Sequence, residues 1–454
     1  MTTANNNSGV LQDHRAMADA TFRKVTLRLI PFLAFLWLLA WIDRVNVGYV
    51  KLTMLQELKW SETVYGLGAG IFFLGYFFFE VPSNMMLQKI GAKKTLMRIT
   101  IGWGSICVAM MYAKTPEVFY VLRFLMGAFE AGFLPGVILY LTYWFPSGRR
   151  AKVLSMITAA SALSSVVGGP LAGTILNTMQ GVNGWSSWQW VFLIEGTPTI
   201  LAGIFTFFYL TDRPEQANWL TPAERRLVHE ELERDHKALG HREHSILAAL
   251  KDVRLWLFVA IYFCIVASNA TLNFYGPSVV KELGFTNPAT IGWIMSGAFL
   301  FGAVAQIWNG AHSDRHHEVR YHCALAAVLG AIGMTIVAFS IGKSVTLTLV
   351  GLVISVIGTS SAFPVFWQMP NRILTGAAAA VGVAVINSLA NLAGFGSPFM
   401  LAEIKTATGG LSLGLYIIAA IEVLAAVMIL KFVPKQHKTT APATAEVGMA
   451  AAKS

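Results

Sequence analysis

Charged residues and cysteines are both scarce in this sequence. Asp, Glu, Lys and Arg make up only 13% of its 454 residues, whereas an ordinary soluble domain carries about 25%. The three cysteines, Cys107, Cys264 and Cys323, all lie in apolar runs and lack the paired spacing of a metal site or a disulfide framework. These scarcities exclude a soluble enzyme, a disordered chain and a disulfide-stapled scaffold.

Apolar residues dominate instead, at 55% of the chain. A membrane-spanning helix needs roughly 20 mostly apolar residues, so twelve helices would use about 240 residues. We predict an all-α membrane protein with twelve transmembrane helices near residues 26–49, 63–87, 95–113, 117–145, 151–176, 188–211, 254–280, 289–312, 321–341, 345–369, 374–402 and 410–432.

These spans divide the chain into two bundles of six helices. We expect a cytoplasmic tail at 1–25, an N-terminal bundle at 26–211, a cytoplasmic linker at 212–253, a C-terminal bundle at 254–433 and a disordered tail at 434–454. Thr221, Pro222 and Glu224 have the spacing of a capping box, which predicts a short linker helix. The predicted N-terminal tail lacks the apolar core of a signal peptide.

The basic residues are distributed unevenly between the predicted loops. With the N-terminus inside, 26 of the 34 Lys and Arg residues fall on the inner side. This bias predicts a multi-pass protein of the plasma (inner) membrane with both termini in the cytoplasm. It also accounts for the net charge of +10 without nucleic acid as a partner.

An internal repeat joins the two predicted bundles. Asn84, Gln88 and Lys89 follow the second helix, and Gly310, Asp314 and Arg315 follow the eighth with the same spacing among themselves. The offset between the two sets is constant and close to half the chain. Such a repeat predicts two pseudo-symmetric halves with a binding site where they meet.

Four charged residues lie inside predicted spans. Asp43 and Arg44 are near the outer end of the first predicted helix, and Arg123 and Glu130 are two turns apart in the fourth, with Gly127 between them. Each charge at a helix centre costs about 2.5 to 3.5 kcal/mol on insertion scales. We expect Arg123 and Glu130 to form a polar seam and the four charges to neutralise one another.

The chemistry of these side chains leaves two interpretations open. A purely structural ion-pair network would hold the first and fourth helices together, and Arg123 could simply hold Glu130. A functional site would use the carboxyl groups of Asp43 and Glu130 to exchange protons, because small rearrangements change the charge of a buried acid. The planar fork of Arg44 would then bind an organic anion.

The repeated loop resembles that of the major facilitator superfamily, which carries Gly-x-x-x-Asp-Arg-x-Gly in each half. Gly310, Asp314 and Arg315 keep this pattern, whereas Asn84 and Gln88 depart from it. In the family this loop gates the inner side, so the resemblance implies a gating loop at 310–315 and a differently built gate in the first half.

Further residues resemble the anion:cation symporters of that superfamily, most closely the tartrate and 4-hydroxyphenylacetate permease branch. They are Asp43-Arg44-Val45-Asn46-Val47-Gly48, Gly75-Tyr76, Arg123 with Glu130, Trp188-Gln189-Trp190-Val191-Phe192 with Glu195-Gly196, and the stretch from Asn387 to Gly396. The resemblance implies that Arg44 and Tyr76 contact substrate, that Asp43 and Glu130 carry protons, and that Arg123 tunes Glu130.

The C-terminal half offers neutral polar and aromatic groups as the opposite wall of the site. We name as substrate-binding candidates Asn273, Tyr275, Trp367, Gln368, Asn387 and Asn391, with Ser161 from the fifth helix. Hydrogen bonds between helices and ordinary packing remain the structural alternatives. Related sugar-acid carriers often place a glutamine near Ser161, so its absence argues against polyols, whereas the aromatic residues keep aromatic acids possible.

Together these features predict a secondary transporter that works by alternating access. We expect proton-coupled symport of a small organic carboxylate, such as a tartrate-like dicarboxylate, a sugar acid or an aromatic acid, by a monomer in contact with lipid. An exporter or antiporter is the alternative within the same class. An enzyme or a sensor is disfavoured, because no nucleophile with its base, cofactor motif, metal site or large output domain is present.

Overall fold

The computed structural model describes residues 2–239, 250–374 and 376–434. This described part is helical and contains no strand. Its α-helices are α1 Thr2–Leu58, α2 Glu62–Ile90, α3 Ala92–Ala109, α4 Pro116–Glu130, α5 Phe133–Thr142, α6 Ser147–Thr158, α7 Ala160–Thr178, α8 Ser187–Tyr209, α9 Pro222–Leu239, α11 Val253–Glu282, α12 Pro288–His316, α13 Arg320–Ser340, α14 Val345–Ile373, α15 Gly376–Asn391, α16 Ala393–Thr408 and α17 Ser412–Phe432.

Twelve segments of the described chain are long and apolar enough to cross a membrane, which confirms the predicted fold class. Three of them consist of two consecutive helices: α4 with α5, α6 with α7, and α15 with α16. The internal repeat is also visible in the helix bounds. Helices α2 and α12 both have 29 residues, and their ends are separated by the same offset as Asn84 and Gly310.

The first helix differs from its prediction at both ends. The sequence predicts it at 26–49, but α1 begins at Thr2 and ends at Leu58. The segment assigned to an N-terminal tail is therefore helical from its second residue. Asp43 and Arg44 consequently lie inside the span rather than near its end. The predicted C-terminal tail lies outside the described residues except for residue 434.

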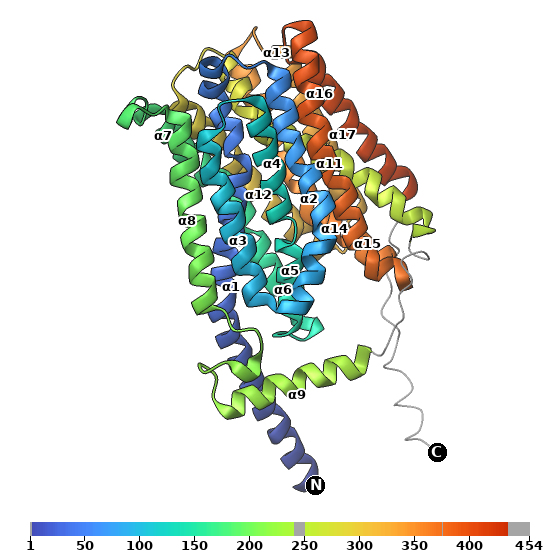
Figure 1. Ribbon diagram of the computed structural model, residues 1–454. Coiled ribbons are helices and arrows are strands. Elements are labelled where there is room, and N and C mark those ends of the chain that lie inside the picture. The colour runs from blue at the N-terminus through green and yellow to red at the C-terminus, as the bar shows by residue number, and fades with distance from the viewer. Residues whose placement is uncertain (1, 240–249, 375, 435–454) are drawn as a thin grey trace.

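Helix α9 crosses one end of the bundle, here called the linker end (Figure 1). Its predicted capping box is present, since the Thr221 amide donates to Glu224 at 2.7 Å and the Glu224 amide donates to the Thr221 hydroxyl at 3.2 Å. Ion pairs from Lys24 to Glu224 at 2.8 Å and from Arg150 to Asp235 at 2.7 Å attach α9 to the N-terminal half.

The two halves pack closely along α7 and α12. At Gly169 and Gly292 the backbones approach so closely that a Cβ on Gly292 would lie 2.2 Å from the Gly169 carbonyl oxygen. One turn further, the Ser296 hydroxyl donates to the Val166 carbonyl at 2.6 Å. Small residues allow such approaches between membrane helices.

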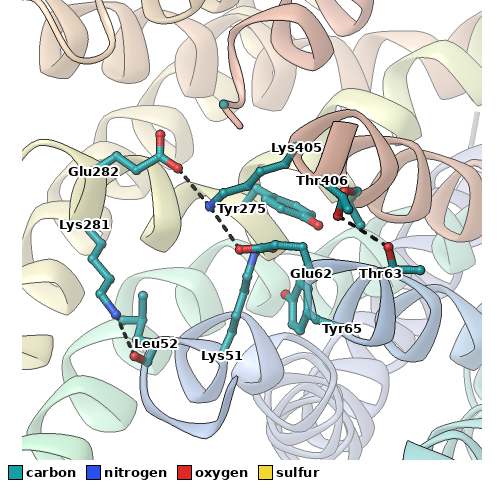
Figure 2. Close-up of polar contacts among 12 residues, drawn as sticks. Lys51, Leu52, Glu62, Thr63, Tyr65, Tyr275, Lys281, Glu282, Lys405 and Thr406 are labelled. Atoms are coloured by element: carbon teal, nitrogen blue, oxygen red, sulfur yellow. Dashed lines mark hydrogen bonds and ion pairs between the residues drawn. The ribbon is translucent and has the colours of Figure 1, made fainter. Parts of the chain in front are cut away.

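Charged side chains join the halves at the opposite end of the bundle, here called the far end. Figure 2 shows this far-end ion cluster, in which Glu62 of α2 contacts Lys51 of α1 at 2.7 Å and Lys405 of α16 at 3.0 Å. Lys405 also contacts Glu282 of α11 at 2.9 Å, and Lys281 donates to the Leu52 carbonyl at 2.8 Å. These contacts hold the far end of the bundle closed.

Within the N-terminal half, Gly127 allows α4 to pack directly on α2. A Cβ at Gly127 would lie 1.9 Å from the Phe72 carbonyl oxygen, whereas a Cβ at Gly396 of α16 would meet nothing within 4 Å. We therefore expect Gly127→Ala to destabilise the fold by about 1 to 3 kcal/mol. Gly396→Ala is the matched control and should leave stability equal or higher, because alanine favours helix. Thermal unfolding in detergent compares them, and equal midpoints would contradict this packing.

A pair of cysteines can report whether the far end is closed. The hydroxyl oxygens of Thr63 and Thr406 are 3.4 Å apart across the halves (Figure 2). We expect Thr63→Cys with Thr406→Cys to form a disulfide in mild oxidant, measured by mass spectrometry of the linked peptides. Thr63→Cys with Thr408→Cys is the control. Adding Lys405→Met should lower the yield, because Glu62 then loses one cation, and an unchanged yield would argue against an electrostatic closure.

Candidate functional site

Arg44 of α1 and Glu130 of α4 form a buried ion pair in the N-terminal half. Both Nε, at 3.1 Å, and Nη2 of Arg44 donate to Oε1 of Glu130. The guanidinium also lies over the rings of Trp41, Phe72 and Tyr76, with Cζ 4.7, 5.2 and 5.5 Å from their centroids. Arg44 is therefore held in one orientation by an acid on one side and by ring faces on the others.

Among the described residues, Arg123 and Glu130 interact electrostatically but form no ion pair, so the predicted polar seam lacks a direct contact between them. Its Nε donates to the Gly68 carbonyl at 3.1 Å, and its Nη2 donates to the Ala69 carbonyl at 3.3 Å. Both acceptors belong to α2. Because Gly127 has no side chain, α2 can pack directly against this face of α4. Backbone carbonyls of α2, rather than the carboxylate of Glu130, thus accept the hydrogen bonds of Arg123.

Asp43 points away from Arg44, as expected for adjacent positions on a helix. It accepts hydrogen bonds from the Thr199 hydroxyl at 2.7 Å, the Trp103 indole at 3.0 Å and the Cys107 thiol at 3.5 Å. These partners come from α3 and α8, and Asp43 has no exposed surface. Of the four charges, only Arg44 and Glu130 form an ion pair among the described residues, and Arg123 acts on Glu130 electrostatically without contacting it.

A second acid, which the sequence analysis named only as part of the family resemblance, lies near Asp43. Glu195 of α8 is 3% exposed and interacts electrostatically with Asp43, with Asn46 of α1 beside it. Within the described residues, neither carboxylate oxygen of Glu195 accepts a hydrogen bond. The interior between α1, α3 and α8 thus contains two acids and no ion-pairing cation in the described part.

The Arg44 pair faces the C-terminal half through Tyr76. Tyr76 lies within electrostatic reach of Arg44, Glu130, Glu80 and Tyr262. Tyr262 of α11 accepts a hydrogen bond from the indole of Trp367 at 3.3 Å, and the two rings meet edge to face at 4.8 Å. Side chains from both halves therefore lie around Tyr76. We call Arg44, Tyr76, Glu80, Glu130, Tyr262 and Trp367 the central cluster.

Glu80 is the acid of the central cluster that sequence reasoning missed, and Tyr262 was missed as well. Glu80 lies one turn after Tyr76 on α2, is 4% exposed and accepts a hydrogen bond from the Ser388 hydroxyl of α15 at 2.5 Å. Asn387 is its second partner. The signal was available, because Glu80 is a charge inside the span predicted at 63–87. It links the two halves beside the Arg44 pair.

The other C-terminal candidates occupy different places. Asn387 joins the central cluster, and Gln368 is half-buried next to Trp367 in α14. Asn391 is half-buried one turn after Asn387. Asn273 donates to the Asn269 carbonyl of its own helix at 2.8 Å.

The last two candidates are Tyr275, which lies away from Arg44, and Ser161, whose hydroxyl already donates a hydrogen bond. Tyr275 donates to the Pro398 carbonyl at 3.2 Å and lies against Lys51, with Nζ 3.8 Å from the ring centroid, so it belongs to the far end. Ser161 donates to the Thr158 carbonyl of its own span at 2.7 Å.

The predicted gating loop lies at the linker end of α12. Gly310 faces Pro364 of α14, where a Cβ would make ordinary contact at 3.6 Å. Asp314 and Arg315 are exposed in the last turn of the helix. Neither takes part in an ion pair with another described residue. The charge contacts that the family resemblance implied are therefore not found among the side chains that the structure describes.

Comparisons with known proteins agree with this architecture. The family model described as Major Facilitator Superfamily matches residues 33–398. A protein of Agrobacterium vitis provisionally named a tartrate transporter is 42% identical over 428 residues, covering 92% of this chain and 98% of its own. A quinolone resistance transporter of Acinetobacter baumannii is 37% identical and covers 88% and 92% of the two chains.

Solved structures share the fold at much lower sequence identity. The xylose transporter XylE from E. coli, in an inward-open conformation, superposes with a TM-score of 0.73 at 14% identity and covers 91% of this chain and 97% of its own. The family match spans most of the sequence, and the relatives are transporters rather than enzymes. The chain therefore belongs to the Major Facilitator Superfamily and is a membrane transporter of that family.

Proposed function

We propose that this transporter carries a small organic carboxylate together with protons. The observation that carries the proposal is the buried Arg44, whose planar fork is bound by Glu130 and faces the cluster where the two halves meet. Arginine binds carboxylates with two parallel hydrogen bonds. A substrate carboxylate can therefore replace that of Glu130 on the same guanidinium.

Proton coupling follows from this competition. When a substrate takes Arg44, Glu130 loses its cation while it stays buried, and an unpaired buried carboxylate is strongly disfavoured. Protonation of Glu130 removes that charge, so anion and proton favour each other's binding by reciprocal linkage. The neutral Glu130 and the bound anion would then cross together.

Asp43 is proposed as a second proton carrier. Among the described residues its hydrogen-bond donors are neutral, and Glu195 is a second acid close to it. Proton exchange at Asp43 requires water to enter between α1, α3 and α8. Arg123 is proposed to tune Glu130 through their electrostatic interaction, while the carbonyls of Gly68 and Ala69 hold its guanidinium in place.

The excess of basic residues at the linker end supports a cytoplasmic location for that end and for both termini, in the plasma (inner) membrane. The closed far end would then face outward, and the structure would represent an inward-facing state. Alternating access would move one half against the other around the central cluster. Opening the far end would require the contacts of Glu62 with Lys51 and Lys405 to separate.

The relative named a tartrate transporter supports uptake of an organic acid. Export or antiport is the second candidate, and the relative named a quinolone resistance transporter supports it. The direction of the driving gradient separates them. Inward-directed protons should drive accumulation by a symporter, whereas an antiporter would expel substrate under the same gradient.

Arg44→Ala should lower carboxylate uptake into proteoliposomes on the order of 100-fold, because a charged hydrogen-bonded partner of the substrate is lost. Arg44→Lys should recover little, since a point charge does not replace the planar fork. Arg28→Ala is the control, since Arg28 is an exposed arginine of the same helix that lies over Tyr209. Normal uptake by a folded Arg44→Ala protein would refute the proposed clamp.

Glu130→Gln should separate substrate movement from proton movement. The amide matches glutamate in size but cannot take a proton, so exchange of labelled for unlabelled substrate should persist while a pH gradient no longer drives accumulation. Both assays use the same proteoliposomes, and wild-type protein should respond to the gradient. Undiminished gradient-driven accumulation by Glu130→Gln would exclude Glu130 as the coupling carboxyl.

A further inference from the structure

Glu80 is a buried carboxyl group that the proposed exchange at Arg44 does not use. Its hydrogen-bond donors, Ser388 and Asn387, are neutral groups of the C-terminal half. Among the residues whose side chains the structure describes, Glu80 has no ion pair with Lys, Arg or His, whereas Glu130 has one with Arg44. The two acids of the central cluster therefore have opposite surroundings.

This difference determines what each acid attracts. A carboxylate accepts hydrogen bonds and donates none, so Glu80 attracts hydroxyl or amino groups and repels other anions. Arg44 attracts anions. The central cluster therefore contains one pole that favours a carboxylate and a second pole that favours a hydrogen-bond donor.

Tyr76 connects the two poles. Its ring centroid is 5.5 Å from Cζ of Arg44, and it interacts electrostatically with Glu80. Tyr76 and Glu80 are four residues apart on α2, which places their side chains on one helix face with Cβ atoms about 6 Å apart. A ligand that binds Arg44 against the Tyr76 ring therefore lies along the helix face that also carries Glu80.

We propose that Glu80 determines substrate specificity by accepting a hydrogen bond from a substrate hydroxyl group in place of Ser388. This inference rests on the proposed function and names its substrate class: hydroxycarboxylates, selected over acids of the same carbon skeleton without hydroxyl groups. The exchange also frees Ser388 from Glu80, so the hydroxyl that is recognised loosens a contact between α2 and α15.

The strength of the preference for hydroxylated acids depends on which donor Glu80 has when the substrate carries no hydroxyl group. Hydrogen bonds to charged groups are among the stronger ones in proteins. An acid without hydroxyls does not leave Glu80 unpaired, however, because Ser388 remains available as its donor. The preference should therefore be about 10- to 100-fold, below that of sites whose polar groups stay unpaired with the wrong ligand.

L-Tartrate and succinate test this inference, because they share a carbon skeleton and both carboxylates and differ only in two hydroxyl groups. Titration calorimetry of the full-length protein in lipid nanodiscs should give a Kd for tartrate about 10- to 100-fold below that for succinate. In Glu80→Gln the ratio should fall to a few-fold, because the neutral amide is a weaker acceptor. In Ser388→Ala the ratio should rise, because the competing donor is gone.

The ratio of affinities separates specificity from a structural role. If Glu80 and Ser388 merely hold the halves together, both variants will weaken tartrate and succinate equally and leave the ratio unchanged, which would overturn the inference. Glu80→Asp and thermal unfolding of each variant check that the fold survives. Aspartate keeps the charge and should retain part of the preference.

The wild-type protein distinguishes the two proposals. Equal affinity for tartrate and succinate, or binding of only non-hydroxylated carboxylates, would overturn the role of Glu80 and leave carboxylate transport intact. Failure to bind any member of a panel of hydroxylated, plain and aromatic carboxylates would overturn the proposed function itself.

Discussion

A charge inside an apolar bundle persists only with a partner, and the pairing of Arg44 with Glu130 is the case on which the centre of this molecule depends. The pair joins α1 to α4 and brings a cation to the cluster where the halves meet. In the proposed mechanism another carboxylate takes the same guanidinium. The pair that neutralises the buried charges would then also make the bundle responsive to an anion.

The other buried charges are stabilised in different ways, and the differences suit different tasks. Arg123 is bound by backbone carbonyls of α2, which no substrate anion can replace without unravelling the helix contact. Asp43 is surrounded by neutral donors from its own half. Glu80 takes its donors from the other half. Of these three residues, Glu80 is the one whose hydrogen bond changes when the two halves move apart.

Contacts between the halves differ along the bundle. At the far end they are ion pairs such as Glu62 with Lys405, and along α7 and α12 they are close backbone approaches at small residues. Near the centre they include the hydrogen bond of Glu80 with Ser388. Ion pairs and hydrogen bonds must break before the halves can move apart, whereas packed glycine surfaces can slide past each other. The interface therefore combines contacts that resist motion with contacts that permit it.

Much of the fold was predictable because it depends on local sequence. Apolar run length predicted twelve spans, the constant offset between the repeated loops predicted the matched helices α2 and α12, and the capping spacing predicted the start of α9. Hydrophobic length and helix caps act within one segment. The rarity of charge in lipid likewise drew attention to Asp43, Arg44, Arg123 and Glu130 without knowledge of their neighbours.

Partner choice was decided only by the tertiary structure. The two-turn spacing suggested that Arg123 would bind Glu130, but α2 packed over Gly127 and its carbonyls took the arginine. Tyr275 proved to belong to the far end, and Glu80 to the centre. The sequence by itself determined which residues would need partners, because that need arises from burial in an apolar span. Which partner each one finds depends on helix rotation and approach, which result from the packing of several helices at once.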